Sequence, residues 1–206
     1  MAEFEQPQIY LITPPEVDLS TFPNLLAGIL DATPIACVRL SLSSRDETVI
    51  SRTGDALREL THPRDVALVI EEHVQMVERL GLDGVHLNDG PRSVRQARKD
   101  LGGDAIVGAH CGTSRHDGIS AAESGADYVS FGPVAATPLG DGAIAGGDLF
   151  SWWSEMIEVP VVAEGFLDEE TVRILCSITD FFAIGQEIWD AENPQEHLLK
   201  LIGCVG

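Results

Sequence analysis

The chain has 206 residues, 44% of them apolar, which is enough for one globular domain to bury a full core without disulfides or a structural metal. Its 13 basic residues face 33 acidic ones, so the formal net charge is −20. This charge keeps a protein soluble and repels the phosphates of nucleic acids and anionic membranes, so we expect neither as a partner.

We expect no secretory signal in the N-terminal residues. Residues 1–5 contain no basic region followed by an apolar one, and the chain has no run of about eighteen apolar residues that would span a bilayer. We therefore expect a cytoplasmic protein. The cysteines are widely spaced without a C-x-x-C pair, which is typical of reduced thiols; they are Cys37, Cys111, Cys176 and Cys204.

Short apolar runs rich in β-branched residues recur along the chain and predict strands. They are nearly continuous rather than alternating, which is typical of strands buried on both faces of a parallel sheet. In chain order, the predicted strands cover residues 8–12, 36–40, 66–70, 84–87, 105–108, 128–131, 160–163 and 181–184.

Segments with the apolar spacing of helices lie between these strands, for example Val74, Val77 and Leu80. Strand and helix alternate eight times, and no Gly-x-Gly-x-x-Gly follows the first strand. This pattern favours a closed barrel over an open doubly wound sheet. We predict that residues 1–206 form a single α/β domain, a parallel (β/α)8 TIM barrel.

A weak internal repeat supports the barrel. Asp83, Asp127 and Asp180 each stand just before a predicted strand, where we expect them in turns at the bottom of the barrel. The glycine- and proline-rich segment 133–147 predicts a long loop after the sixth strand. Active sites of such barrels lie at the ends of the strands, so this loop is a candidate lid.

Several stretches resemble thiamine phosphate synthase and its barrel relatives. They are 10–13, 84–87 followed by Arg98, 125–134 followed by Thr137 and Pro138, and 160–163. The Gly-Ala-Asp-Tyr…Gly-Pro…Thr-Pro pattern is the most specific, and the resemblance spans nearly the whole chain. It implies a transferase that joins a pyrimidine methyl diphosphate to a thiazole phosphate and releases pyrophosphate with the help of Mg²⁺.

Most of the family's charged site residues are replaced in this chain. The Gln, Arg and Lys of the family's second strand fall on Arg39, Ser41 and Ser43, and the lysine expected after Thr137 is missing. Cys111 stands where the family has a serine that meets the diphosphate. The resemblance places all five residues in the substrate site.

The same resemblance indicates three carboxylates as metal ligands. The family's Asn-Asp pair falls on Glu71 and Glu72, and Asp89 substitutes for an aspartate that would fall on Pro91. Carboxylate oxygens suit a hard cation, so we predict that Glu71, Glu72 and Asp89 hold Mg²⁺.

The phosphate end of the site follows the last two strands. Backbone amides of Gly165, Gly185 and Gln186 suit a phosphate, although Glu164 beside them disfavours an anion. Glu187 and Asp190 either point at the barrel mouth or serve the dipole of the last helix.

The loop after the fifth strand adds two histidines and an arginine at the catalytic end. We predict His110 or His116 as acid or base and Arg115 as an anion ligand. In the alternative, Ser114 caps a helix, and Arg115 and His116 are solvated. A third hypothesis is a metal held by His110, Cys111 and His116. His86, inside a strand, is expected to be structural.

Three functional hypotheses remain open. The first is the synthase reaction, and the second is a related tautomerase-type proton transfer by His110 or His116. The third is a non-catalytic paralogue that binds a ligand or a partner protein. We expect a small phosphorylated or heterocyclic ligand, and a homodimer is left open.

Overall fold

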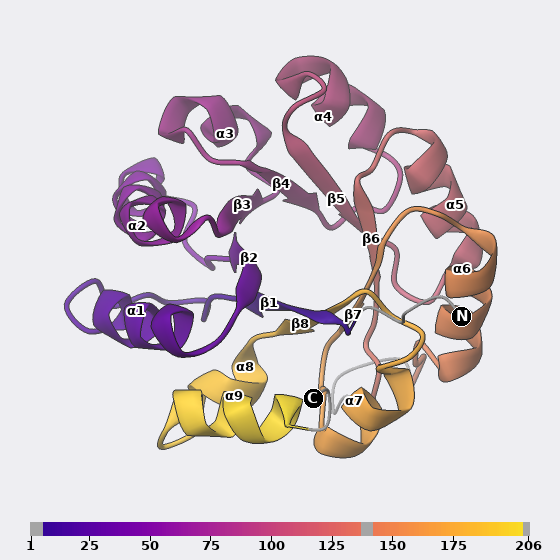
Figure 1. The fold of residues 1–206 in the computed structure, drawn as a ribbon. Coiled ribbons are helices and arrows are strands. Elements are labelled where there is room, and N and C mark those ends of the chain that lie inside the picture. The colour runs from indigo at the N-terminus through magenta and orange to yellow at the C-terminus, as the bar shows by residue number, and fades with distance from the viewer. Residues whose placement is uncertain (1–5, 137–141, 204–206) are drawn as a thin grey trace.

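The computed structural model, which describes residues 6–136 and 142–203, is a closed barrel of eight parallel strands surrounded by helices (Figure 1). In barrel order the strands are β1 (Gln8–Ile12), β2 (Ile35–Leu40), β3 (Ala67–Glu71), β4 (Gly84–Leu87), β5 (Ile106–His110), β6 (Tyr128–Phe131), β7 (Val161–Glu164) and β8 (Phe181–Ile184). Each predicted strand is found within two residues of its predicted bounds. The predicted (β/α)8 barrel is thereby confirmed.

Helices follow the strands and pack on the outside of the barrel. They are α1 (Phe22–Ala32), α2 (Glu47–Thr61), the 3-10 helix η1 (His62–Arg64), α3 (Val74–Leu80), α4 (Val94–Leu101), α5 (Arg115–Glu123), α6 (Gly147–Met156), α7 (Glu169–Leu175), α8 (Gln186–Trp189) and α9 (Pro194–Ile202). Side-chain N-caps begin four of them, at Asp46, Ser114, Asp168 and Asn193, each accepting a backbone N–H of the first turn.

The apolar side chains divide into two clusters because successive residues of a strand point to opposite sides. The larger cluster lies between strands and helices and includes the buried Leu26, Phe150 and Trp153. The smaller one fills the barrel and includes Cys37, Val69 and Val162. The barrel interior is therefore packed at its centre, and only its open ends are available for ligands.

The aspartates of the internal repeat tie neighbouring strands together at their N-terminal ends. Asp83 accepts the N–H of Leu68 at 2.6 Å, Asp127 that of Val107 at 2.7 Å, and Asp180 that of Val161 at 2.7 Å. Each carboxylate thus satisfies a backbone donor of the preceding strand, which confirms the structural role expected for these residues.

Two sequence expectations concern the loop after β6 and the possibility of membrane insertion. Residues 133–136 and 142–146 form no helix or strand, and α6 begins at Gly147; Thr137 lies outside the described residues. Within the described ranges, no helix combines the length and apolarity that crossing a bilayer requires.

Of the cysteines, Cys37, Cys111 and Cys176 are free thiols.

A glycine in β4 shows how closely adjacent strands approach. A Cβ added at Gly84 would lie 2.0 Å from the backbone carbonyl oxygen of Ile106 in β5, its register partner. We expect Gly84→Ala to lower the free energy of unfolding by roughly 1–3 kcal/mol or more, because a backbone atom cannot rotate away. Urea unfolding measures this; Gly103→Ala, which has nothing within 4 Å of its new Cβ, is the control. Equal stability of the two variants would contradict the prediction.

Candidate active site

The C-terminal end of the barrel carries a cluster of charged side chains that point inward. Arg39 of β2 donates from Nη1 to Glu164 Oε2 of β7 at 3.3 Å, and its Nε lies 3.6 Å from Glu71 Oε2 of β3. The second distance is that of an ion pair rather than a hydrogen bond. Asn88, just after β4, donates to the other Glu71 oxygen at 2.7 Å. The cluster therefore crosses the barrel mouth from β4 to β7.

His110, the last residue of β5, continues this cluster. Its Nδ1 lies 3.0 Å from Glu164 Oε1 and 3.0 Å from the hydroxyl oxygen of Ser130 in β6. When Nδ1 donates its proton to the carboxylate, the neutral ring presents Nε2 as an acceptor; when the ring is protonated, Nε2–H is a donor. Glu164 thus orients His110 for proton transfer.

Opposite charges govern the ionisation of Glu164 and Arg39. Burial alone would raise the pKa of Glu164, but the Arg39 guanidinium and His110 outweigh it and hold the pKa well below the ordinary value of 4.5. Burial lowers the pKa of Arg39, and Glu164 reverses this effect and raises it. Both groups are charged at neutral pH, so the site contains a fixed ion pair.

A second polar layer lies beneath the charged one. The hydroxyls of Tyr10 and Tyr128 are 2.7 Å apart, and His86 Nδ1 lies 2.8 Å from the Tyr128 hydroxyl. Burial and the nearby Arg39 lower the pKa of His86 well below its ordinary value, so the ring is neutral. This hydrogen-bonded His86 has the structural role expected from the sequence, and the layer forms a rigid floor under Arg39.

The other predicted residues of the fifth loop lie away from this cluster. Arg115 donates to the backbone oxygen of Asp148 at 3.1 Å, and its guanidinium carbon is 5.0 Å from the centre of the Trp152 ring, so its side chain is committed to α6. His116 is exposed. Cys111 is buried, and burial raises the pKa of its thiol to about 12. Ser114 caps α5, as the alternative interpretation expected.

The serines predicted after β2 belong to the rim between β1 and β2. The backbone N–H of Ser41 donates to Thr13 Oγ1 at 3.0 Å, and the hydroxyl of Ser43 donates to the carbonyl oxygen of Pro15 at 3.1 Å. Both serines therefore fix the loop after β1 against β2, beside Arg39.

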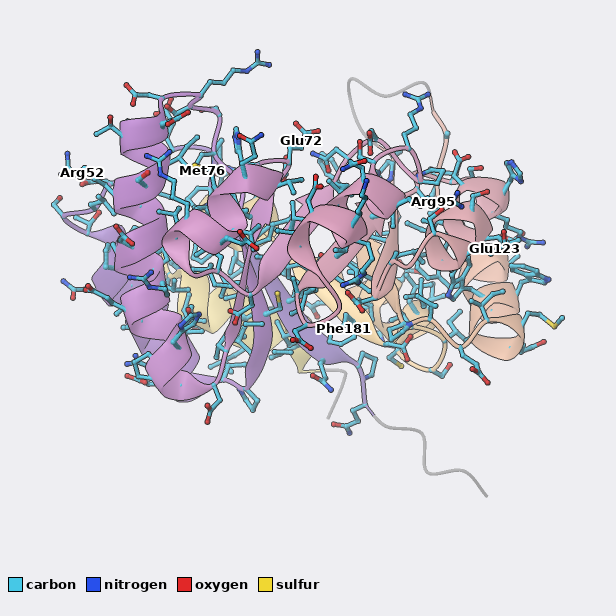
Figure 2. All side chains as sticks on the ribbon, turned by 90° about the horizontal axis from the view of Figure 1, so that it is seen from above. Arg52, Glu72, Met76, Arg95, Glu123 and Phe181 are labelled. Atoms are coloured by element: carbon cyan, nitrogen blue, oxygen red, sulfur yellow. The ribbon has the colours of Figure 1, made fainter. Side chains whose placement is uncertain are left out.

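The three predicted metal ligands are spread along the rim. Glu71 is engaged by Arg39 and Asn88, while Glu72 is exposed with a left-handed backbone and lies at the end of the molecule opposite Phe181, the first residue of β8 (Figure 2). Asp89 accepts from Ser93 through Oδ2, and its buried Oδ1 has no partner. Among the described residues, no group of three or more His, Cys, Asp or Glu side chains is arranged for a metal.

A pocket of about 410 Å³ opens beside the charged cluster, between the ends of β1, β7 and β8. The predicted residues Gly165, Gly185 and Gln186 line it together with Ile12, Thr13, Glu164, Phe166, Ala183, Glu187 and Asp190. Because Glu164 contacts both the pocket and Arg39, a ligand in this pocket would lie against the ion pair.

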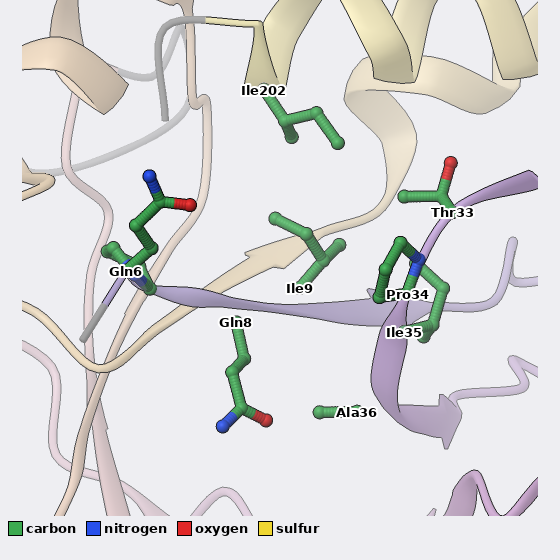
Figure 3. Close-up of a pocket in the computed structure, with 9 residues that line it drawn as sticks. Gln6, Gln8, Ile9, Thr33, Pro34, Ile35, Ala36 and Ile202 are labelled. Carbon is green, nitrogen blue, oxygen red and sulfur yellow. The ribbon is translucent and has the colours of Figure 1, made fainter. Parts of the chain in front are cut away.

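A second pocket, of about 420 Å³, lies at the opposite end of the barrel, where β1 and β2 begin (Figure 3). Its lining is mostly apolar, with Ile9, Pro34, Ile35 and Ile202, and no described lining residue is ionisable. It therefore lacks groups for acid–base chemistry, and the strand ends with Arg39 and His110 remain the candidate active site.

Glu164 is the site residue whose position sequence reasoning undervalued. It ends an apolar strand at an inward position, two residues after the barrel residue Val162. That alternation is the signal that would have placed its carboxylate inside the barrel. Its partners Arg39 and His110 were predicted, but their convergence on Glu164 was not.

The comparisons by family and by sequence agree on one family. The chain matches the family described as "Thiamine monophosphate synthase" over residues 9–187. It is 40% identical over 185 residues to a thiamine-phosphate synthase of Rhodospirillum centenum, covering 89% of each chain. It is 34% identical over 200 residues to one of Erythrobacter litoralis, covering 94% of this chain and 93% of that one.

The fold comparison agrees with this similarity. A solved thiamine phosphate pyrophosphorylase from Pyrococcus furiosus covers 96% of both chains with a TM-score of 0.81 and 22% sequence identity. At this identity the likeness concerns the barrel fold alone.

We expect Arg39→Met to lower the free energy of unfolding by roughly 3–5 kcal/mol, because Glu164 would lose its buried counter-charge. Urea unfolding at neutral pH measures the loss. Arg79→Met, which removes an exposed ion pair with Glu47, is the control and should cost about 1 kcal/mol or less. A similar loss in both variants would contradict a special role for the buried pair.

The lowered pKa of Glu164 predicts an acid-sensitive contribution to stability. The unfolded chain binds this proton near the ordinary value of 4.5, whereas the folded chain binds it at lower pH. The contribution is therefore present above 4.5 and is lost as the pH falls through the folded value. The stability of the wild type minus that of Glu164→Gln should shrink over this range in denaturant titrations. A difference that does not change with pH would be inconsistent with the ion pair.

Proposed function

Because the chain belongs to the thiamine monophosphate synthase family, we propose that it condenses a pyrimidine diphosphate with a thiazole phosphate in thiamine biosynthesis. The observation that carries this proposal is the 40% identity over nine-tenths of the chain to a thiamine-phosphate synthase. The inward-facing ion pair at the strand ends supplies the site, since barrels of this kind place their chemistry there.

The reaction separates charge, and the cluster offers both signs. As the diphosphate leaves, its oxygens gain negative charge and the pyrimidine methylene carbon becomes electron-poor. Arg39 would attract the leaving group, while the carboxylates of Glu71 and Glu164 would stabilise the electron-poor carbon and the thiazolium that forms. Because these three groups are held by one another, little reorganisation is needed when the charges develop.

His110 would supply part of the positive charge that is missing with the lysine the family has after the position of Thr137. Held by Glu164 through Nδ1, its protonated ring would donate a hydrogen bond from Nε2 to the diphosphate. The predicted Arg115 and His116 are assigned no direct role in this proposal, because Arg115 contacts α6 and His116 is exposed.

Magnesium is the family's usual metal, and one carboxylate of the rim fits it best. The unpartnered Oδ1 of Asp89 is available to a hard cation, and Glu71 and Glu72 stand on the neighbouring strand end. When bound, Mg²⁺ would neutralise the charge of the departing diphosphate. Such ions are commonly held by one or two carboxylates together with substrate phosphates, so a cage of three protein ligands is not required.

A second candidate function is proton transfer within a thiazole. The contacts of His110 with Glu164 and Ser130 favour it, because they orient an acid–base imidazole without requiring a diphosphate. His110 would then transfer the proton, and the substrate would need no leaving group.

The test is formation of thiamine phosphate from the two precursors by the purified protein, with and without Mg²⁺. We expect Mg²⁺-dependent turnover and a loss of about a hundredfold or more in kcat for His110→Gln, because removing one positioned hydrogen-bond donor to developing negative charge costs about that much. His197→Gln, an exposed histidine of α9, is the control.

The outcomes separate the two candidates. Turnover that depends on His110 supports the synthase. No condensation, combined with His110-dependent exchange of thiazole protons with solvent, would instead support the tautomerase reaction. Condensation at the wild-type rate in His110→Gln would remove His110 from the mechanism.

A further inference from the structure

Glu187, in the short helix α8 after β8, accepts two backbone N–H groups, one from the N-cap residue of its own helix and one from a different loop. Its Oε2 accepts the backbone N–H of Gly185 at 2.8 Å, and its Oε1 accepts that of Leu167 at 3.2 Å. The first amide belongs to the loop after β8 and the second to the loop after β7. One carboxylate thus joins two loops through a pair of backbone donors.

Such converging amides are the groups that barrels and nests use to bind anions. Gly185 lines the pocket between β1, β7 and β8, and Leu167 directly follows its lining residue Phe166. The described lining includes Glu164, Glu187 and Asp190 and no arginine or lysine. The amide of Gly185 is therefore a group of this wall that attracts an anion, and Glu187 already accepts its N–H together with that of Leu167.

The loop that supplies one of these amides is held in an unfavourable conformation. Gly165 and Phe166 both have positive φ angles, 85° and 62°, and Phe166 is 52% exposed at the pocket. A left-handed aromatic residue persists only where its surroundings enforce it, and such positions gather at ligand sites. The next N–H, of Leu167, is the one that Glu187 accepts. The carboxylate of Glu187, accepting this N–H, therefore helps to keep the loop in its observed conformation.

We propose that Glu187 is a resident anion that determines specificity: it holds the amides of Gly185 and Leu167 when the pocket is empty, and a phosphate binds there only by displacing it. This rests on the proposed function insofar as the phosphate is that of the thiazole substrate. The exchange weakens binding of free phosphate and favours ligands that gain further contacts, such as ring stacking on the exposed Phe166.

The experiment is calorimetric titration of the full chain with inorganic phosphate and with the thiazole phosphate. We expect Glu187→Ala to bind both about tenfold or more tightly than the wild type, because hydrogen bonds to charged groups contribute strongly and the competitor is gone. Glu187→Gln, which keeps the shape of the side chain without its charge, should give a smaller gain in the same direction.

Asp190→Asn is the matched control. It removes the same charge from the same pocket, but Asp190 accepts from the side-chain amide of Gln186, and no hydrogen bond to a backbone N–H is recorded for it among the described residues. If displacement of Glu187 governs binding, Asp190→Asn should raise the phosphate affinity by less than about threefold, because it removes only a neighbouring charge that is screened by solvent. Equal gains in phosphate affinity in Asp190→Asn and Glu187→Ala would mean that the gain comes from the loss of negative charge in general, and would overturn the proposal. So would an unchanged or weaker affinity in a Glu187→Gln variant whose thermal unfolding matches the wild type.

Failure of this inference is distinguishable from failure of the proposed function. Phosphate binding requires no turnover, so tighter binding in Glu187→Ala supports the resident anion even if the wild type condenses no precursors. Conversely, a wild type that forms thiamine phosphate, with phosphate affinities that Glu187 does not alter, would retain the synthase and remove the resident anion.

Discussion

The guanidinium of Arg39 lies inside the barrel almost without contact with water, and a buried charge of this kind is costly unless it is paired. The structure pairs it twice, with Glu164 of β7 and with Glu71 of β3, and stacks it above Tyr10 at 5.7 Å. Each partner has a further neighbour, His110 for Glu164 and Asn88 for Glu71. The positions of the mouth residues thus follow from one requirement, which is to keep this cation compensated.

The fold was predictable because its signals are local. A strand buried on both faces is a continuous apolar run, and the aspartates of the repeat, such as Asp83, mark the turns before strands. The site was predictable only in part. The family resemblance pointed to Arg39, and His110 was proposed because it begins the polar loop after the fifth predicted strand. Their meeting on Glu164 could not be predicted, because Arg39 and Glu164 are 125 residues apart and no local pattern encodes which strand ends face each other across a barrel.

Arg115 shows that a residue's place in the sequence does not determine where its side chain points. Its place at the start of α5 is at the catalytic end of the barrel, which made it a candidate anion ligand. The competing attraction of Asp148 and Trp152 on the neighbouring helix draws the side chain along the outside instead. A position in the sequence identifies the end of the barrel, but the side-chain partners decide whether a long residue reaches its mouth.

The replacement of cations and the presence of Glu187 have a common physical consequence. With Arg39 neutralised by two glutamates and the amides of Gly185 and Leu167 held by a third, the empty site offers little net attraction to a phosphate. In the proposed reaction, binding would then be driven by exchange: the ligand's phosphate would replace a carboxylate, and a metal ion brought with the diphosphate would supply positive charge. Such a site discriminates against simple anions because they lack the ring contacts that offset the displaced carboxylate. The acidic mouth is thus compatible with phosphorylated substrates, provided that the charges it lacks arrive with them.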